Sequence, residues 1–482
     1  MMLLRRTFIY MPAQIMGPLA QFLAAAIWTY FLAPEAFGTY VLVWAIQELA
    51  LLLVLSWWSA YALRYITSHN DDILRFDGVE IAIQLAATIL QTLFVALALL
   101  VVFHELPGMN LLAATLAFTL TRNLTWHFAD RSRASSAILA YTILNSCGSV
   151  LGLAFGIVAV LLFAPTPEIV LWSYALAQAL GLVLAWSFIR TSTLRPRLDL
   201  SLVRGAFAYG APLMIGNALA WVAMHGLRFV VEHEQGLAGV GLISVGWWLG
   251  MRATTFTGQL ATTAGFTLAV EKVREAGQRA ALPQLASNGA LLLAALIPTV
   301  AGVIMLNAPL VDALVSEPYR AITRDILPLA IATGAVRIFR IHATDQCFLL
   351  FNRPKLDIIF AGAEAVLVLL ACYIGLHLDG GRGAVMGCLI ANAIVTLASF
   401  VTVNRIFGYY LRPLDVLRVI VAVAAMMLVL HILPPAHSRV ELVGHILAGA
   451  ITFALAIAAG FPRICGLAIQ RLLSLRPSPS SP

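Results

Sequence analysis

Residues 81–103, IAIQLAATILQTLFVALALLVVF, run for 23 positions without one charged side chain. The hydrocarbon core of a bilayer is about 30 Å thick, and an α-helix needs about 20 mainly apolar residues to cross it. Glu80 precedes the run, and His104 and Glu105 follow it, so polar residues mark both ends. We therefore predict a transmembrane helix over residues 79–103.

Runs of this kind recur along the whole chain of 482 residues. The chain is 61% hydrophobic and 11% charged, with a mean hydropathy of +0.91, whereas a soluble domain has about 25% charged residues. The runs predict an all-α, polytopic membrane protein with about 14 transmembrane helices. The predicted spans are 8–31, 38–63, 79–103, 110–128, 136–163, 167–189, 205–231, 238–269, 285–306, 325–350, 357–377, 384–404, 414–433 and 441–461.

The basic residues of the connecting segments lie almost entirely on one side of these spans. Of the 30 Lys and Arg, 21 fall on the side of the termini, and only four fall in segments on the opposite side (Arg320, Arg324, Arg382 and Arg439). Because cytoplasmic segments carry the excess of Lys and Arg, this pattern places both termini in the cytoplasm. The formal net charge of +7 is spread along that membrane face, so it does not indicate a nucleic-acid partner.

No motif for a metal, a cofactor or catalysis is apparent, and we predict that the chain is not an enzyme. The five cysteines have no close spacing and lie in or beside apolar runs, which predicts small buried side chains. There is no phosphate-binding loop, no HExxH and no serine elbow. The first apolar run passes directly into a second span, so we expect it to be retained and not cleaved as a signal peptide.

A weak internal repeat predicts two six-helix halves. Pro12 in the first span is followed by Gly38 at the start of the second, and Pro212 and Gly239 have the same relation in the seventh and eighth. Transporters built from such repeats place the substrate between the halves. The predicted division is an N-terminal lobe at 1–199, a C-terminal lobe at 200–410, two additional helices at 411–465 and a basic, disordered tail at 466–482. The larger connections, around 190–204 and 270–284, have room for one surface helix each.

Four arginines lie deep in predicted spans: Arg122, Arg252, Arg337 and Arg340. Each costs about 2.5–3.5 kcal/mol at a helix centre, so each should face a partner or a watery cavity. They stand in polar stripes at helical spacing. Guanidinium groups bind phosphate oxygens in bidentate fashion, which favours an anionic, sugar-bearing ligand. The predicted substrate-binding residues are Arg252, Arg122, Arg337, Arg340, Arg64, Trp248, Thr255 and Gln259.

Membrane acids offer two other interpretations. Asp345 and His342 share a helix with Arg337 and Arg340, so these arginines could stand in ion pairs instead of binding substrate. Asp345, Glu48 and Glu364 could also be protonation sites that couple transport to an ion gradient. His225 is interpreted as an interfacial helix residue, because a lone histidine makes a poor metal site.

The opening segment, FLAPEAFGTYVLVWAI followed by WWSAYALRYI, resembles the polysaccharide-transport and oligosaccharide-flippase families of the multidrug, oligosaccharidyl-lipid and polysaccharide exporter superfamily. The segment LRPRLDLSLVRGAFAYGAPLMIGNALAW is similar to their amphipathic lead-in and seventh helix. The resemblance implies two six-helix lobes around a cationic cavity, alternating access and a polyprenyl-pyrophosphate-linked glycan as cargo. One departure is the segment HGLRFVV, which has Gly226 and Leu227 where members often carry an Asp.

The leading hypothesis is a flippase of the bacterial inner membrane for O-antigen, capsule or exopolysaccharide assembly. The implied partners are the lipid-linked oligosaccharide, the bilayer, and a polysaccharide polymerase or co-polymerase. A drug or cation exporter of the same fold should have an acidic cavity, which the excess of deep arginine disfavours. A membrane-embedded polymerase or ligase would need a sizeable outward loop, and the longest, at 307–324, is short. A scaffold without transport activity also stays open.

The predicted orientation is testable with single cysteines in a chain whose five native cysteines are replaced by alanine. A membrane-impermeant maleimide should label Arg320→Cys in intact cells and Arg197→Cys only after permeabilisation. Labelling of both variants in intact cells would contradict the predicted topology.

Overall fold

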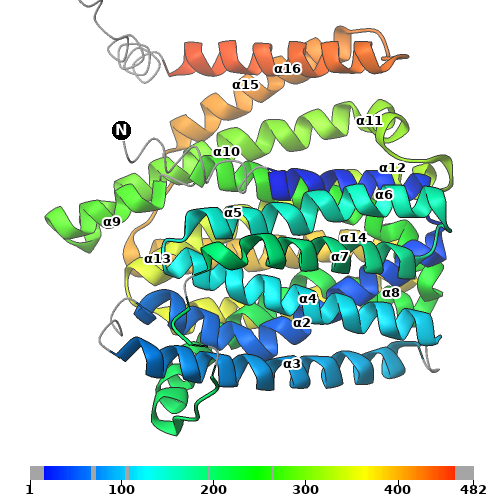
Figure 1. Cartoon of the computed structure of the whole chain (residues 1–482). Coiled ribbons are helices and arrows are strands. Elements are labelled where there is room, and N and C mark those ends of the chain that lie inside the picture. Colours follow the sequence, from blue (N-terminus) through cyan, green and yellow to red (C-terminus); the bar gives the residue numbers. More distant parts are fainter. Residues whose placement is uncertain are drawn as a thin grey trace, which may run out of the picture.

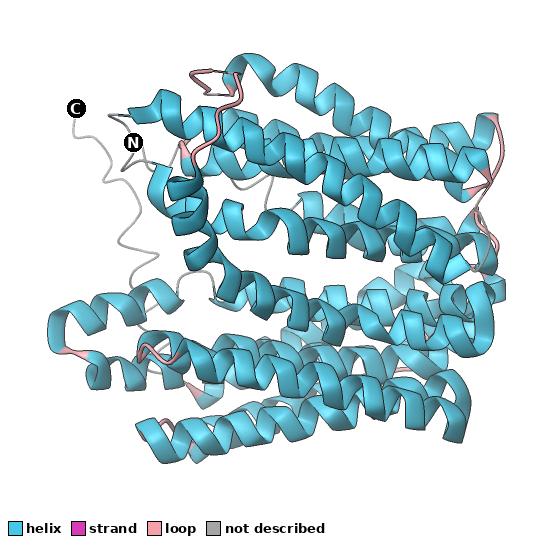
Figure 2. Cartoon of the chain, turned by 90° about the horizontal axis from the view of Figure 1, so that it is seen from below, coloured by secondary structure: helices cyan, strands magenta, loops and turns pink. Residues whose placement is uncertain are grey.

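The computed structural model describes residues 16–66, 72–103, 108–189, 191–193, 195–262 and 265–461, and these form helices joined by short turns, with no strand among them. Figures 1 and 2 show the helices as a stack of nearly parallel rods with the turns gathered at two ends. The all-α class predicted from the sequence is confirmed.

The predicted N-terminal lobe, residues 1–199, includes the helices up to residue 188. They are residues 16–27 continued by η1 (Trp28–Tyr30), α2 (Pro34–Tyr65), α3 (Ile73–Phe103), α4 (Met109–Ala134), α5 (Ile138–Ser146), η3 (Cys147–Leu151), α6 (Gly152–Leu162), α7 (Pro167–Ala185) and η4 (Trp186–Phe188). The segment η3 is a π-helical turn, so α5, η3 and α6 make one continuous span.

The helices of the predicted C-terminal lobe, 200–410, and the two predicted additional helices follow. They are α8 (Leu200–Thr262), α9 (Gly265–Ala276), η5 (Gln278–Ala281), α10 (Leu282–Met305), α11 (Asn307–Leu314), α12 (Glu317–Phe339), η6 (Arg340–Thr344), α13 (Asp345–Leu350), α14 (Pro354–Phe407), α15 (Pro413–Ile432) and α16 (Arg439–Gly460). The last two pack against α10 at the edge of the stack (Figure 1).

Two of these elements, α8 and α14, each consist of two helical arms joined by a tight turn. In α8 the backbone turns at Gly236 (φ 68°), and in α14 it turns at Asp379 and Gly380 (φ 53°). A positive φ is open to glycine because it has no Cβ. The two arms of α14 pack so closely that a Cβ on Gly375 would overlap the carbonyl oxygen of Gly383. Each hairpin supplies two spans.

The number of spans agrees with the prediction. Among the described residues, ten helices are long and apolar enough to cross a membrane, and α8 and α14 count twice. The helix α4 has the length of a span but a more polar composition, and it packs against α2, α3 and α7. With α4 these make thirteen spans, and the first predicted span, 8–31, lies partly outside the described residues, which begin at residue 16. One boundary was wrong: the eighth span ends at Thr262, and residues 265–276 form the separate helix α9.

The bundle has two chemically different ends. The basic end, on the left in Figure 1, holds the turns after α2, α4 and α13, with Arg64, Arg133 and Arg353. The opposite end, on the right, holds the start of α2, the start of α12 and the hairpin turns of α8 and α14.

The two lobes meet at the opposite end without space for side chains. A Cβ on Gly38 would overlap the carbonyl oxygen of Leu237, and one on Gly241 would overlap that of Pro34. The Ser316 amide donates to Thr29 Oγ1 at 3.1 Å, and the Tyr319 hydroxyl donates to the Leu32 carbonyl at 2.8 Å. These contacts close the opposite end.

The lobes also meet at the basic end. A Cβ on Gly210 of α8 would overlap the carbonyl oxygen of Trp57 of α2. One turn away, Arg64 Nη1 donates to the Tyr209 hydroxyl at 3.2 Å. The helices α2 and α8 therefore touch near both ends of the bundle.

Substituting Gly38 or Gly241 should destabilise the contact between α2 and α8. Gly38→Ala and Gly241→Ala each add a methyl group where a backbone oxygen lies, and overpacking of this kind costs about 1–3 kcal/mol. We expect a lower melting temperature in detergent for both variants. Gly216→Ala is the matched control, because no atom lies within 4 Å of its Cβ position. Equal melting of Gly38→Ala and the control would show that the close approach is not needed.

Candidate functional site

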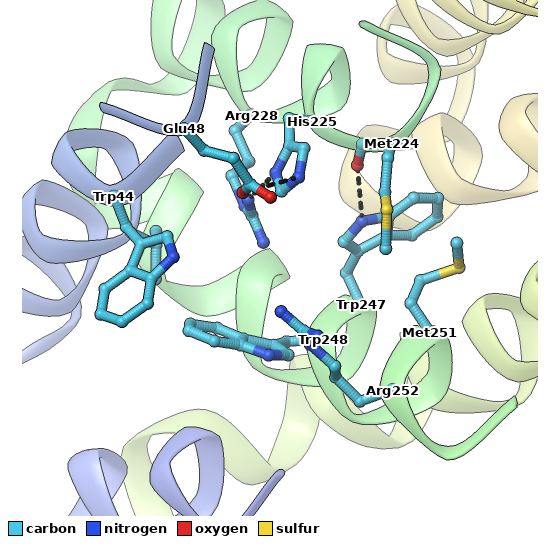
Figure 3. Close-up of a pocket in the computed structure, with 10 residues that line it drawn as sticks. Trp44, Glu48, Met224, His225, Arg228, Trp247, Trp248, Met251 and Arg252 are labelled. Atoms are coloured by element: carbon cyan, nitrogen blue, oxygen red, sulfur yellow. Dashed lines mark hydrogen bonds and ion pairs between the residues drawn. The ribbon is translucent and has the colours of Figure 1, made fainter. Parts of the chain in front are cut away.

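A small polar cavity lies between the lobes, about midway along α2 and both arms of α8. It is lined by Val41, Trp44, Glu48, Met224, His225, Arg228, Trp247, Trp248, Met251 and Arg252 (Figure 3). Its volume is ≈ 20 Å³, which holds one or two water molecules. At this volume the cavity has no room for a sugar or a phosphate group.

One wall of the cavity is a chain of three polar groups. Arg228 Nη1 lies 2.5 Å from His225 Nδ1, and His225 Nε2 lies 3.4 Å from Glu48 Oε2. Arginine can only donate, so His225 Nδ1 accepts and the ring proton sits on Nε2, facing Glu48. The chain joins α2 of one lobe to α8 of the other, so Glu48 and His225 lie at the contact between the lobes (Figure 3).

Two guanidinium groups stand over tryptophan rings at this site. Arg122 of α4 lies 4.3 Å from the ring centre of Trp44, and Arg228 lies 5.8 Å from that of Trp248. A guanidinium over an aromatic face is stabilised by the ring quadrupole, most of all away from water. Figure 3 shows Arg228 and Arg252 pointing into the same space between Trp44 and Trp248.

The site has more positive than negative charge. Glu48 is the carboxylate whose charge acts on Arg122, Arg228 and Arg252. Among the described residues, neither Arg122 nor Arg252 has an ion pair, and Nε of Arg122 and of Arg228 is buried without a hydrogen-bond partner. Three guanidinium groups and one carboxylate leave a surplus of two positive charges. Buried donors without partners suit a bound anion.

Arg337 and Arg340 have a different environment from the cavity arginines. Arg337 Nε lies 2.8 Å from Glu364 Oε1, while Arg340 contacts Glu364 Oε2 at 2.5 Å and Asp345 Oδ2 at 3.0 Å. The Ser399 hydroxyl donates to Asp345 Oδ1 at 2.8 Å. Two positive and two negative charges balance here, as in the ion-pair interpretation of these arginines. The cluster includes the π-helical turn η6, which sets Arg340 next to Asp345.

The other predicted residues are divided between the cavity and its approaches. Trp248 and Glu48 line the cavity with Arg252. Thr255 is one turn further along α8 and donates to the Met251 carbonyl at 2.8 Å, and Gln259 is exposed beyond it. Arg64 lies at the basic end, 5.4 Å from the ring centre of Tyr209. Asp345 and Glu364 are in the ion-pair cluster, away from the cavity residues.

The sequence analysis missed part of the site. His225 was interpreted as interfacial, but it is buried in the cavity with Arg228. Trp44 was not singled out, and Arg228 was not counted among the deep arginines. The spacing of Trp221, His225 and Arg228 on one helical face was the available signal, because it continues the stripe toward the end of the predicted seventh span.

Comparison with known sequences agrees with the resemblance seen in the segments quoted above. The sequence model of the family described as polysaccharide biosynthesis protein matches residues 3–241. This match confirms the predicted resemblance to the polysaccharide-transport families. No curated protein matches the sequence.

Several solved structures have the same fold. The structure described as lipid II flippase MurJ, inward closed conformation, superposes with a TM-score of 0.69 at 13% identity, over 96% of this chain and 100% of that chain. An inward-facing multidrug resistance MATE family transporter of the MOP superfamily gives 0.58 at 16% identity, over 83% and 98%. A MOP superfamily transporter from Pyrococcus furiosus, described as having a reversed polarity of its binding pocket, gives 0.57 at 15% identity, over 84% and 98%. The chain therefore has the fold of these transporters.

The balanced cluster generates a stability prediction. Glu364→Gln should leave Arg337 and Arg340 with one carboxylate between them, and an uncompensated buried charge costs about 3–5 kcal/mol. We expect a strongly lowered melting temperature, partly restored by adding Arg337→Met. The exposed Asp312→Asn, which removes a surface partner of Arg324, is the control. A Glu364→Gln variant as stable as this control would argue against the ion pair as the reason for these charges.

Proposed function

We propose that the protein is a flippase that carries polyprenyl-pyrophosphate-linked oligosaccharide across the bacterial inner membrane by alternating access. The observation that carries the proposal is the surplus of arginine in the cavity between the lobes. Arg122, Arg228 and Arg252 offer bidentate donors for phosphate oxygens, and Trp44 and Trp248 offer aromatic faces for sugar rings. A family described by polysaccharide biosynthesis is the context in which such cargo occurs.

The charge of the cavity decides between two cargo classes. An exporter of cationic drugs needs carboxylates where the cation binds, because like charges repel. The cavity has one carboxylate, Glu48, and it is close to three guanidinium groups. An anionic headgroup is therefore favoured over a cation. The substrate set is Arg252, Arg122 and Arg228 with Trp248, while Arg337 and Arg340 support the lobe through their ion pairs.

Transport requires the lobes to separate at one end at a time. A cavity of ≈ 20 Å³ cannot admit a pyrophosphate, so the site has to enlarge before the headgroup can bind. In our proposal the basic end faces the cytoplasm, as the positive-inside rule requires. The headgroup would enter there, past Arg64, and leave at the end closed by Gly38 and Gly241. The lipid tail would remain in the bilayer.

Glu48 is our candidate for ion coupling among the three predicted carboxylates. It is the carboxylate that lines the cavity, and it pairs with His225 across the contact between the lobes. Protonation of Glu48 would remove the negative charge that competes with a phosphate for the arginines. Asp345 and Glu364 are held by Arg337 and Arg340, so their protonation would first have to break a buried ion pair.

The enzyme and scaffold hypotheses have less support. The outward segment at 307–324, where a polymerase or ligase would need catalytic residues, is mostly helical, with Asp312 paired to Arg324. A scaffold would not need unpaired arginines in its interior, because such charges destabilise a membrane protein unless they have a function. Interaction with a polymerase or co-polymerase remains part of the proposal and does not depend on the cavity.

The proposal predicts the effect of removing a cavity arginine. Arg252→Ala should abolish surface glycan, with complete lipid-linked repeat units accumulating on the cytoplasmic side, while the protein stays folded and inserted. Removing a hydrogen bond to a charged group costs about 1.5–3 kcal/mol, or one to two orders of magnitude in transport. Arg320→Ala, at the opposite end, is the matched control. Normal glycan in the Arg252→Ala strain would overturn the site assignment.

A further inference from the structure

A second and larger cavity lies at the opposite end of the bundle, on the right in Figure 1, among helices of the predicted C-terminal lobe. It is bounded by the second arm of α8, by α12 and by the turn of α14. Its volume is ≈ 290 Å³, compared with ≈ 20 Å³ for the cavity between the lobes. Small-molecule sites commonly have volumes from about 300 Å³ upward. This second cavity therefore has the size of a site for a small ligand.

The floor of the second cavity is apolar and is built from helices. Leu242 and Ile243 come from α8, and Ile322 and Ile326 come from α12. Ile326 is fully buried and Ile243 is almost so. A Cβ on Gly381, just after the turn of α14, would touch the Ile243 side chain. The shape of the floor is therefore set by close packing of three elements, and not by a loop.

The rim of the second cavity is polar and exposed. Four side chains form it: Gln235, Asp325, Asp379 and Arg382. Asp379 Oδ2 lies 3.9 Å from Arg382 Nε. A carboxylate accepts hydrogen bonds, a guanidinium donates them, and an amide does both. The rim therefore offers donors and acceptors side by side above an apolar floor.

This lining discriminates between classes of ligand. A phosphate group would meet two carboxylates and one guanidinium, and like charges repel. A metal ion has no suitable set of ligands, because no group of three His, Cys, Asp or Glu among the described residues can hold one. A wholly apolar ligand would cover the rim and leave its polar groups without partners. A sugar ring fits both parts, since its hydroxyls donate and accept while its C–H face contacts aliphatic side chains.

We propose that the second cavity is a carbohydrate-binding site for one or two sugar units of the cargo, at the end of the bundle that is predicted to face outward. Asp325 and Asp379 accept hydrogen bonds from sugar hydroxyls, Gln235 and Arg382 donate to them, and the apolar floor contacts the ring. This inference rests on the proposed function, because it assigns a place to the glycan of the same cargo.

The second cavity does not depend on separation of α2 from α8. Gly241 of the second arm of α8 lies against Pro34 of α2, whereas a Cβ on Gly246 of the same arm would lie 3.0 Å from Ile326 of α12. The cavity is on the α12 side of the arm. Leu242 precedes Arg252 by about 15 Å along the helix. Sugars can therefore be held at the outward end while the arginine site between the lobes is empty.

Saturation-transfer difference NMR on the full chain in nanodiscs tests the carbohydrate site. The probe is the free oligosaccharide released by mild acid from the lipid-linked repeat units of the source cells, so it has neither lipid nor phosphate. Wild-type protein should transfer saturation to the sugar protons, above the level of empty nanodiscs. Ile322→Trp fills the cavity and should abolish the transfer. Asp325→Ala removes one acceptor and should weaken the affinity about 2- to 10-fold.

Two control variants match these changes at the same end of the bundle. Val440→Trp adds the same bulk at a position that is 82% exposed, and Glu35→Ala removes an exposed carboxylate from the first turn of α2. Both should bind the oligosaccharide as the wild type does. Melting temperatures check folding, and Asp325→Ala decides the matter should Ile322→Trp fail to fold, because Asp325 is exposed.

Three results would overturn the carbohydrate site. One is the absence of transfer in the wild type, and another is equal affinity of the wild type and a folded Asp325→Ala variant. The third is a phospholipid that copurifies with the wild type but not with Ile322→Trp, without any sugar signal, which would assign the cavity to lipid.

A flipping assay separates this inference from the proposed function. In proteoliposomes with the lipid-linked repeat unit, flipping by a wild type that does not bind the free oligosaccharide would refute the carbohydrate site and leave the proposed function standing. Absence of flipping, together with sugar binding that Ile322→Trp abolishes, would refute the proposed function and leave the carbohydrate site standing.

Discussion

The free energy of burying a guanidinium group in a membrane constrains this structure more than any other single term. An arginine inside the bilayer needs an acid, a ligand or water. The buried arginines of this protein occur in two kinds of environment. Three arginines pair with carboxylates of their own lobe: Arg131 in the N-terminal lobe, and Arg337 and Arg340 in the C-terminal lobe. Three others lie between the lobes near the carboxylate of Glu48: Arg122, Arg228 and Arg252. The first group is paired with carboxylates, and the second group leaves a surplus of positive charge between the lobes.

Close glycine contacts bring these charges together. Gly38 and Gly241 let α2 and α8 touch through their backbones at one end, and Gly210 does the same with Trp57 at the other. In a bilayer, where lipid is as apolar as the side chains, helices associate largely through such close packing. The same two helices, α2 and α8, provide most of the lining of the cavity between the lobes.

The two lobes each contain a buried charge cluster of similar composition. Both are organised around an arginine between two carboxylates, Arg340 in one lobe and Arg131 in the other. Arg337 supplies a second positive charge in the cluster of the C-terminal lobe. In the cluster of the N-terminal lobe, His127 Nε2 lies 3.9 Å from Glu80 Oε1.

The sequence by itself determined the class of the fold and the number of spans, because the apolar runs and their helical length follow from the thickness of a bilayer alone. It also singled out Arg122 and Arg252 as deep charges, because they have no acid on their own helix face. Tertiary structure decided which charges are paired: Glu364 meets Arg337 across 27 residues and Glu80 meets Arg131 across 51. It also brought His225 and Arg228 to Glu48 across the contact between the lobes. Hydropathy and helical spacing describe one helix at a time, whereas charge pairing depends on which helices become neighbours.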